Sequence, residues 1–566
     1  MISIGIVARL TSLVVAALML LTTASLSRLG AVEPFRKLRS AIIDRAALAY
    51  LDLVWNISLK VGPRISLNSL RLAVAFTLAM AAAQLLILSL IPLGSVTLPA
   101  ILASCIGCLA VLLRPLLQVR ARASEHAKGI RRELPYFAIL MSISESVGID
   151  LAYLLRRVAE TKLFKYIRRE AELVLRDSRL FFTGIVEALE FRARLGLEQT
   201  FSRFLYSYTA RLRSGGNTLM LVREWVKDLL SSIDFEWSEF VNDASVIGQM
   251  AVALFLITPL LLSIMMFFMP GGVERFVTFL PLGLLPILIA VVEVSRPKTL
   301  DDVHNVRLAP CIVLGVLIGV ALHMSGVAPY VSIIVAWSTS AALGMAIMEK
   351  RIRDCMRGEG DAIPLLRSLS EAKRLGLEIK DSLRRLAESP ELSPATRSVL
   401  ERFLKLTGMG APPTYAAAMV DTPSFLLRFS LYALGLIMES GGGDPQVLEE
   451  FLESVRRIHE ARRRAREKLG LLAFLGTAIP IAAVVVIYSL HPLFTAMDSA
   501  STPFLPPLSI GAEEFFPRIV TMSVLAAMSY AVVISRVIDG SFVSRLHIPY
   551  IASSVIAVLA YSYLMT

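Results

Sequence analysis

Long runs of apolar residues constrain this chain more than any other feature of its sequence. A helix needs roughly 20 apolar residues to cross a hydrocarbon core of about 30 Å, and ten stretches meet that length. They lie near residues 10–27, 69–91, 96–116, 245–269, 275–295, 307–324, 327–348, 469–490, 517–536 and 547–565. Hydrophobic residues make up 55% of the 566 residues and charged residues only 18%, which excludes a water-soluble globular fold. The sequence predicts an all-α, polytopic membrane protein with about ten transmembrane helices.

The candidate spans fall into groups of three, four and three, and two long charged stretches separate the groups. Apolar residues in both charged stretches recur at helical spacing with charges between them, which predicts two helical bundles. The expected domains are an N-terminal membrane region at 1–116, a helical domain at 117–244, a four-span region at 245–348, a second helical domain at 349–468 and a three-span region at 469–566.

Basic residues in the connections predict the orientation of the spans. The connection at 28–71 is rich in Lys and Arg, whereas only Arg9 precedes the first span. The short connections near 296–307 and 536–545 are also basic. We therefore expect a multi-pass protein of the plasma membrane with both charged stretches in the cytoplasm. The net charge of +12 then reflects this asymmetry and contact with anionic lipids, not binding of nucleic acid.

Motifs for catalysis, cofactors or metals are missing from the sequence. It contains no phosphate-binding loop that ends in Gly-Lys-Ser/Thr, no His-Glu-x-x-His and no Gly-x-Ser-x-Gly. Cys105 and Cys108 lie in the middle of an apolar span, where small residues favour close helix packing. His459 is expected on an exposed helix face. We predict no catalytic residue, cofactor or metal site, and no enzyme.

The two charged stretches also resemble each other. After Gly148 comes "LLRRVAE" and after Gly376 comes "SLRRLAES", so Arg156 and Arg157 match Arg384 and Arg385. Further on, "LYSYTARLRSGGN" matches "LYALGLIMESGGG". The separation from the first glycine to the Ser-Gly-Gly is 67 residues in the first stretch and 65 in the second. This conserved spacing predicts an internal duplication.

Glycines in both stretches predict the ends of helices. Gly148 and Gly376 are expected in the turns of helical hairpins, and the Ser-Gly-Gly segments are expected to end a later helix. The second set comprises Gly215, Gly216, Gly441 and Gly442. A direct role of these glycines in binding is the alternative.

The segments "TFSRFLYSYTARLRSGGN" and "TPSFLLRFSLYALGLIMESGGGD" resemble the Ser-Gly-Gly block of the type II secretion system F-domain family. Two copies among grouped spans look like its archaeal branch, which includes the platform proteins of the archaellum and of adhesive pili. The two Ser-Gly-Gly blocks differ in one charge, since the second has Glu439 where the first has Arg213. The resemblance implies a non-enzymatic platform that oligomerises, as a dimer or trimer. It also implies docking of a cytoplasmic hexameric ATPase and contact with pilin subunits.

Within this resemblance, we expect the ATPase to dock on Arg156, Arg157, Arg384 and Arg385, because arginine pairs well with carboxylates at interfaces. The alternative is that these arginines pair with Glu160 and Glu388 on their own helices. The basic runs at 120–132 and 462–468 lie beside spans and are expected to contact lipid head groups. For the whole protein, the competing function is a permease with regulatory cytoplasmic domains.

Overall fold

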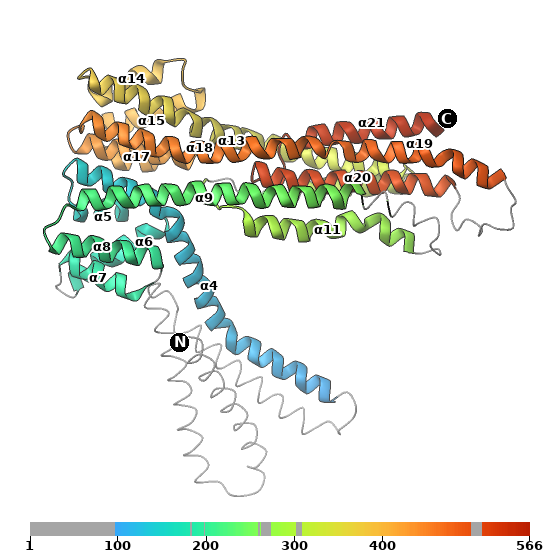
Figure 1. Cartoon of the computed structure of the whole chain (residues 1–566), viewed down its shortest axis with the longest axis horizontal. Coiled ribbons are helices and arrows are strands. Elements are labelled where there is room, and N and C mark those ends of the chain that lie inside the picture. The colour runs from blue at the N-terminus through green and yellow to red at the C-terminus, as the bar shows by residue number, and fades with distance from the viewer. Residues whose placement is uncertain are drawn as a thin grey trace, which may run out of the picture. The chain divides into compact units, whose positions relative to one another are not determined.

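The computed structural model describes residues 97–180, 184–196, 198–257, 261, 273–301, 308–499 and 512–565, with side chains from Arg120 onward except at a few segment ends. Every regular element in these ranges is a helix (Figure 1). The predicted all-helical class is thus confirmed for this part of the chain. The expected spans near 10–27 and 69–91 lie outside the described residues, and the one near 96–116 falls in a segment described by its backbone alone.

Six helical segments within the described ranges are long and apolar enough to cross a membrane. They are Thr218–Ile257, Val277–Ser295, Pro329–Arg374, Pro445–Pro492, Glu514–Ile538 and His547–Leu564. A seventh predicted span corresponds to the shorter apolar helix Ala309–Met324. The chain is therefore a multi-pass membrane protein, while the total of ten spans stays a prediction.

The chain divides into two compact units. Unit 1 comprises Met1–Leu134 and Lys165–Gly216, and unit 2 comprises Pro135–Phe164 and Asn217–Thr566. The expected domain at 117–244 is therefore split between the units, because its first helical hairpin belongs to unit 2. The boundaries of the five expected domains differ from those of the two compact units, and these domains stay a prediction.

Unit 1 contains three short helices that follow the first part of a long one. They are α6 (Tyr166–Leu180), α7 (Ile185–Leu195) and α8 (Gln199–Arg213), and the long helix is α4 (Thr97–Ser146). A buried ion pair forms the polar centre of this unit, because two guanidinium nitrogens of Arg192 donate to Glu170 at 2.7–3.0 Å. His126 lies 2.9 Å from the same carboxylate.

Unit 2 begins with the end of α4 and α5 (Leu151–Glu160), and its remaining helices fall into three sets. The long ones are α9 (Thr218–Val252), α13 (Pro329–Arg374) and α18 (Pro445–Leu475). The short ones are α14 (Ile379–Glu388), α15 (Pro394–Gly408), α16 (Pro413–Met419) and α17 (Phe425–Glu439). The remaining apolar ones are α11 (Val273–Ser295), α12 (Ala309–Met324), α19 (Ala478–Ser499), α20 (Ala512–Ile538) and α21 (His547–Met565).

Residues 135–164, 218–244 and 349–468 form what we call the helical head of unit 2. In Figure 1 the long helices α9, α13 and α18 run side by side from the head to the apolar helices. Helix α17 is the core of the head. Its sequence is apolar on all sides, and twelve of its fifteen residues are buried, as expected for a helix with neighbours all round.

The helices of the two predicted copies follow one another in the same order. Helices α5 and α14 each have 10 residues, and α6, α15, α8 and α17 each have 15. The turn glycines also correspond, since Gly148 and Gly376 have φ of 72° and 78°. Gly215, Gly441 and Gly442 have positive φ as well, whereas Gly216 is not among these residues. The parallel supports a duplication, which stays a prediction.

Candidate functional site

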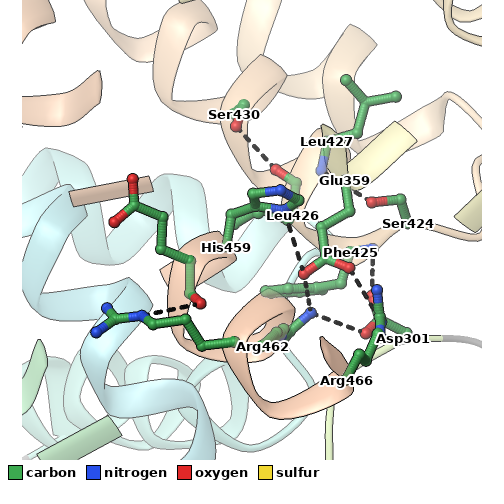
Figure 2. A network of polar contacts seen from close by, with 12 residues as sticks. Asp301, Glu359, Ser424, Phe425, Leu426, Leu427, Ser430, His459, Arg462 and Arg466 are labelled. Carbon is green, nitrogen blue, oxygen red and sulfur yellow. Dashed lines mark hydrogen bonds and ion pairs between the residues drawn. The ribbon is translucent and has the colours of Figure 1, made fainter. Parts of the chain in front are cut away.

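One buried arginine joins several segments of the head. The Arg462 side chain, on α18, is 5% exposed, and Figure 2 shows it among acidic residues. Its Nη1 donates to Asp301 at 3.0 Å and to Glu359 at 3.1 Å. Its Nη2 donates to the Tyr136 hydroxyl at 3.1 Å. Asp301 in turn accepts from the backbone N–H of Phe425 at 3.0 Å. One side chain thus holds α4, α13, α18, the start of α17 and the connection after α11.

The charges in this network balance each other. Burial alone would lower the pKa of Arg462, but Tyr136 and the carboxylates of Asp301 and Glu359 hold that pKa well above its ordinary value. Glu359 also lies 3.4 Å from an Arg466 nitrogen and 3.9 Å from Nδ1 of His459. Burial lowers the pKa of His459, so that its imidazole is neutral at pH 7.

Two expectations from the sequence need correction here. Arg462 was expected to contact lipid head groups as part of the run at 462–468, yet it is buried among acidic partners, while Arg463 and Arg464 are exposed. His459 was expected on an exposed face, yet its side chain is only 16% exposed. The reason is helical geometry, because α18 turns one face toward α13 and the other toward solvent.

A second polar junction fixes α5 to α16 and α17. The Glu439 side chain is 9% exposed and accepts from the Tyr153 hydroxyl at 2.9 Å. It also accepts from the N–H and the hydroxyl of Thr414 at 3.0 and 2.7 Å. Arg157 completes the junction, with Nε 3.4 Å from Glu439 and two hydrogen bonds to Tyr153. Glu439, which stands in the second stretch where the first has Arg213, therefore connects helices that are far apart in the chain.

The four arginines at which we expect the ATPase to dock lie in different surroundings. Arg157 belongs to the Glu439 junction and is 3.5 Å from Glu160, the pairing that the alternative predicted. Arg156, Arg384 and Arg385 are exposed, and Arg384 has only a loose contact of 3.8 Å with Asp381. Within the described residues, the arginines of α5 and those of α14 share no partner, since Arg157 pairs with Glu160 and Glu439 and Arg384 with Asp381.

A groove of about 440 Å³ lies on the head between α4, α9 and α18. Apolar side chains from all three helices line it, among them Ile139, Ile143, Leu230 and Phe451. Ionic side chains also line it, and Arg223 of α9 pairs with Glu450 of α18 at 2.9 Å. The groove could not be predicted from the sequence, because its walls come from three segments separated by many residues.

Two acidic residues with corresponding roles were also missed. Glu133 accepts from the backbone N–H groups of Lys165, Tyr166 and Ile167 at 2.7–3.0 Å, at the start of α6. Asp361 accepts from the N–H and hydroxyl of Ser393 at 3.1 and 2.5 Å, at the start of α15. Both satisfy free donors at a helix N-terminus. Each lies 15 residues before its turn glycine, Gly148 or Gly376, and this equal spacing in the sequence could have revealed them.

Metal chemistry has no candidate in the part of the chain that the structure describes, since no group of three His, Cys, Asp or Glu side chains comes together there. Cys311 and Cys355 are buried free thiols, and burial raises the pKa of Cys355, which disfavours the reactive thiolate. The network at Arg462 thus holds structure together and offers no nucleophile or metal ligand set.

A helical head continuous with helices that are long and apolar enough to cross a membrane is typical of a multi-pass membrane protein. Residues 365–490 match the family model described as type II secretion system protein F, so the chain carries a domain of this family. It is also 22% identical over 142 residues to an uncharacterized protein of Methanocaldococcus jannaschii, a match that covers 25% of this chain and 24% of that protein. The match thus spans about a quarter of the relative's length. No solved structure matches the chain.

Proposed function

We propose that this protein is the membrane platform of a filament-assembly machine of the type IV pilus class. One observation carries the proposal: the F domain at 365–490 includes the head helices α14–α17 and continues along α18 into the apolar helix α19. A single domain of a secretion family therefore has one part outside the bilayer and one part within it. That is the arrangement that a coupling protein needs if it is to pass movement from the cytoplasm to membrane-embedded subunits.

The long helices provide a path for such movement. Helix α18 packs along both α9 and α13, and each of the three extends from the head into a membrane-length apolar segment. The Arg462 network clamps α13 and α18 together with α17. A force on the head is then transmitted through packed helices, because close-packed interiors deform little.

The proposal includes finer features that rest on the resemblance. The partner is a cytoplasmic hexameric ATPase, and the cargo is pilin subunits that pass from the membrane into the filament. The head lies in the cytoplasm, the two helical copies arose by duplication, and the platform works as a dimer or trimer. The M. jannaschii relative supports an archaeal setting.

Docking is proposed on the exposed arginines of the head. Arg384 and Arg385 lie on α14, and Arg156 lies on α5. Among the described residues, the loose Asp381 contact of Arg384 is the one ion pair that these three side chains make. Arg157 is reassigned to the Glu439 junction, where its loss would disturb the fold and not only binding. A carboxylate-bearing surface of the ATPase is the expected partner of the three exposed side chains.

The test is co-purification of the full chain, in detergent, with the secretion ATPase from the same gene neighbourhood. The double variant Arg384→Glu/Arg385→Glu should reduce retention of the ATPase at least tenfold, because two attractions become repulsions. Arg402→Glu, an exposed arginine on α15, is the matched control and should retain the ATPase. Failure of the unaltered protein to bind the ATPase would remove the mechanism.

The permease alternative makes a different prediction. Vesicles containing only the purified chain should accumulate a solute if the alternative holds, and should not if the platform function holds. Uptake by such vesicles would replace our proposal.

A further inference from the structure

Helix α9 has a long outer face that is exposed from the head down to the membrane. Five exposed side chains recur on this face at helical spacing: Glu224, Asp228, Phe235, Glu239 and Asp243. Within the described residues, none of the four carboxylates takes part in a hydrogen bond or an ion pair. Phe235, between them, is 65% exposed. We call this the acidic face of α9, and it leaves one large apolar side chain for a partner to cover.

The α4 helix of the same chain meets α9 on the other side. Ile139 and Ile143 at the end of α4 line the groove of the head, to which α9 contributes Val226 and Leu230. A helix turns by about 100° per residue, so these two α9 side chains point roughly opposite to Asp228. The acidic face is therefore left for another molecule.

Helix α4 has a cationic face within unit 1. His126 and Ile130 of this helix are buried, and the exposed side chains on the opposite side are Arg120, Ser124, Lys128 and Arg131. Glu125, the acidic residue among them, is engaged by the Tyr166 hydroxyl at 2.9 Å. The cationic face of α4 is thus the electrostatic complement of the acidic face of α9.

The length of the cationic face argues against lipid as its whole partner. The predicted span of α4 ends at 116, and Arg131 follows 15 residues later, which is about 22 Å along a helix. Head groups add only about 5–8 Å on each side of the hydrocarbon core. The expected lipid contact of the run at 120–132 therefore suits Arg120, whereas Lys128 and Arg131 lie beyond the reach of the head groups.

The charges of the two faces match in spacing. Arg120 and Arg131 are eleven residues apart, and so are Asp228 and Glu239. Helix α4 runs away from its predicted span and α9 runs toward its own, so at a shared membrane border the two helices are antiparallel. One antiparallel register then places Arg120 opposite Glu239 and Arg131 opposite Asp228. Two ion pairs about 16 Å apart follow from this register.

The membrane borders support the same register. It places residue 116, the end of the predicted span 96–116, opposite residue 243, two residues before the predicted span 245–269. It also places Phe235 opposite Ser124, an exposed residue whose small side chain leaves room for the ring. Charge, apolar contact and span borders thus agree on one arrangement.

We propose that the acidic face of α9 binds the cationic face of α4 from a second copy of this chain. Each copy carries both faces, so two identical contacts form around a twofold axis and close a dimer. The purpose of this dimer rests on the proposed function, within which it supplies the interface of the platform oligomer.

Disulfide formation between two differently tagged chains tests the contact. One full chain carries Ser124→Cys and the other carries Phe235→Cys, both without the four native cysteines. Mixed in lipid vesicles, they should form a disulfide dimer that contains both tags. Ser124→Cys mixed with Lys227→Cys is the control, because Lys227 is exposed on α9 but lies off the acidic face. Absence of the dimer, or equal yields from both mixtures, would overturn the proposal.

Charge reversal tests the predicted pairs. Arg131→Glu and Asp228→Arg should each weaken the dimer about tenfold, because like charges then face each other in both contacts. A chain that carries both changes should regain the dimer, which also shows that the altered protein folds. Arg122→Glu, exposed on another side of α4, should leave the dimer intact. The readout is energy transfer between labelled chains in vesicles, and no loss in the single variants or no recovery in the double variant would overturn the pairing.

These measurements contain neither ATPase nor filament. A chain that stays monomeric in vesicles but still retains the ATPase would overturn the α4–α9 contact and leave the platform function standing. A chain that forms this dimer but does not bind the ATPase would leave the contact standing and count against the platform function.

Discussion

Single buried charges hold the head of this protein together. Arg462 reaches Asp301, Glu359 and Tyr136, three partners that lie 103 to 326 residues away in the chain. A buried charge is costly to leave without partners, so such a network stabilises one packing of the helices against others. The Glu439 junction works in the same way for α5, α16 and α17.

Removal of the Arg462 side chain tests this view at the scale of one residue. Arg462→Ala leaves the buried Asp301 with its backbone hydrogen bond from Phe425 but without this ion pair, and Glu359 with only the longer contact to Arg466. It should destabilise the protein by about 3–5 kcal/mol. Arg463→Ala, one residue further along α18, removes only an exposed contact with Glu467 and should leave stability nearly unchanged. The measurement is chemical denaturation in detergent, and equal effects of the two variants would contradict the assignment.

His459 makes the stability of the head depend on pH. Burial holds its pKa below the ordinary value of 6.5, so the unfolded chain binds a proton there more readily than the folded one. The stability that this imidazole contributes is complete above pH 6.5 and is lost as the pH falls through the lowered pKa.

We therefore expect the melting temperature to fall between pH 7 and about pH 5, and His459→Gln should weaken this dependence. Glu359, which favours the charged imidazole, and Arg462, Arg463 and Arg466, which oppose it, face the same ring. If the melting temperatures of the unaltered protein and of His459→Gln change equally with pH over this range, His459 does not titrate as described.

At the scale of elements, the membrane part is built around an interruption between α18 and α19. The interruption leaves backbone carbonyls without helical partners, and the Tyr530 hydroxyl donates to the carbonyl of Leu472 at 2.7 Å. Tyr550 donates in the same way to the carbonyl of Ala473. Such pairing is required in a membrane, where no water replaces a lost backbone hydrogen bond. Gly476 lies at the interruption and leaves room for both rings.

Adding one methyl group at this interruption should disrupt it. In Gly476→Ala the new Cβ would lie 2.0 Å from the Tyr530 ring, and the overpacking should cost about 1–3 kcal/mol. Gly470→Ala is the control on the same helix, because nothing lies within 4 Å of its Cβ position and alanine favours helix. Thermal unfolding in detergent should separate the two variants. A Gly476→Ala protein as stable as the control would refute the packing.

At the scale of the whole molecule, the first hairpin of the stretch 117–244 belongs to the unit that contains residues 349–468. Tyr136 packs edge-on against Phe425 and Phe429 of α17, with ring centres 4.9 and 5.1 Å apart. Phe164 lies 6.2 Å from Phe425. The hairpin therefore covers apolar surface on α17 that residues 349–468 themselves do not cover.

This arrangement predicts that residues 349–468 are not stable alone. Expressed without the hairpin, they should aggregate and bind a hydrophobic dye, because the aromatic face of α17 is uncovered. A fusion that adds residues 135–164 should increase the soluble fraction and reduce dye binding. If the fragment 349–468 alone is monomeric, shows a cooperative unfolding transition and does not bind the dye, the hairpin is not needed and the division into units is wrong.

The amino-acid order alone was enough to predict the class of protein, the apolar segments within the described ranges, the hairpin turns and the F-domain family. These features follow from local properties: run length, helical spacing and glycine at turns. The partners of Arg462 and Glu439, the groove and the placement of the hairpin depended on the tertiary structure. Each of these features brings together segments that are far apart in the chain. In the sequence, Arg462 and its neighbour Arg463 cannot be told apart, because only the packing of α18 against other helices buries one and leaves the other exposed.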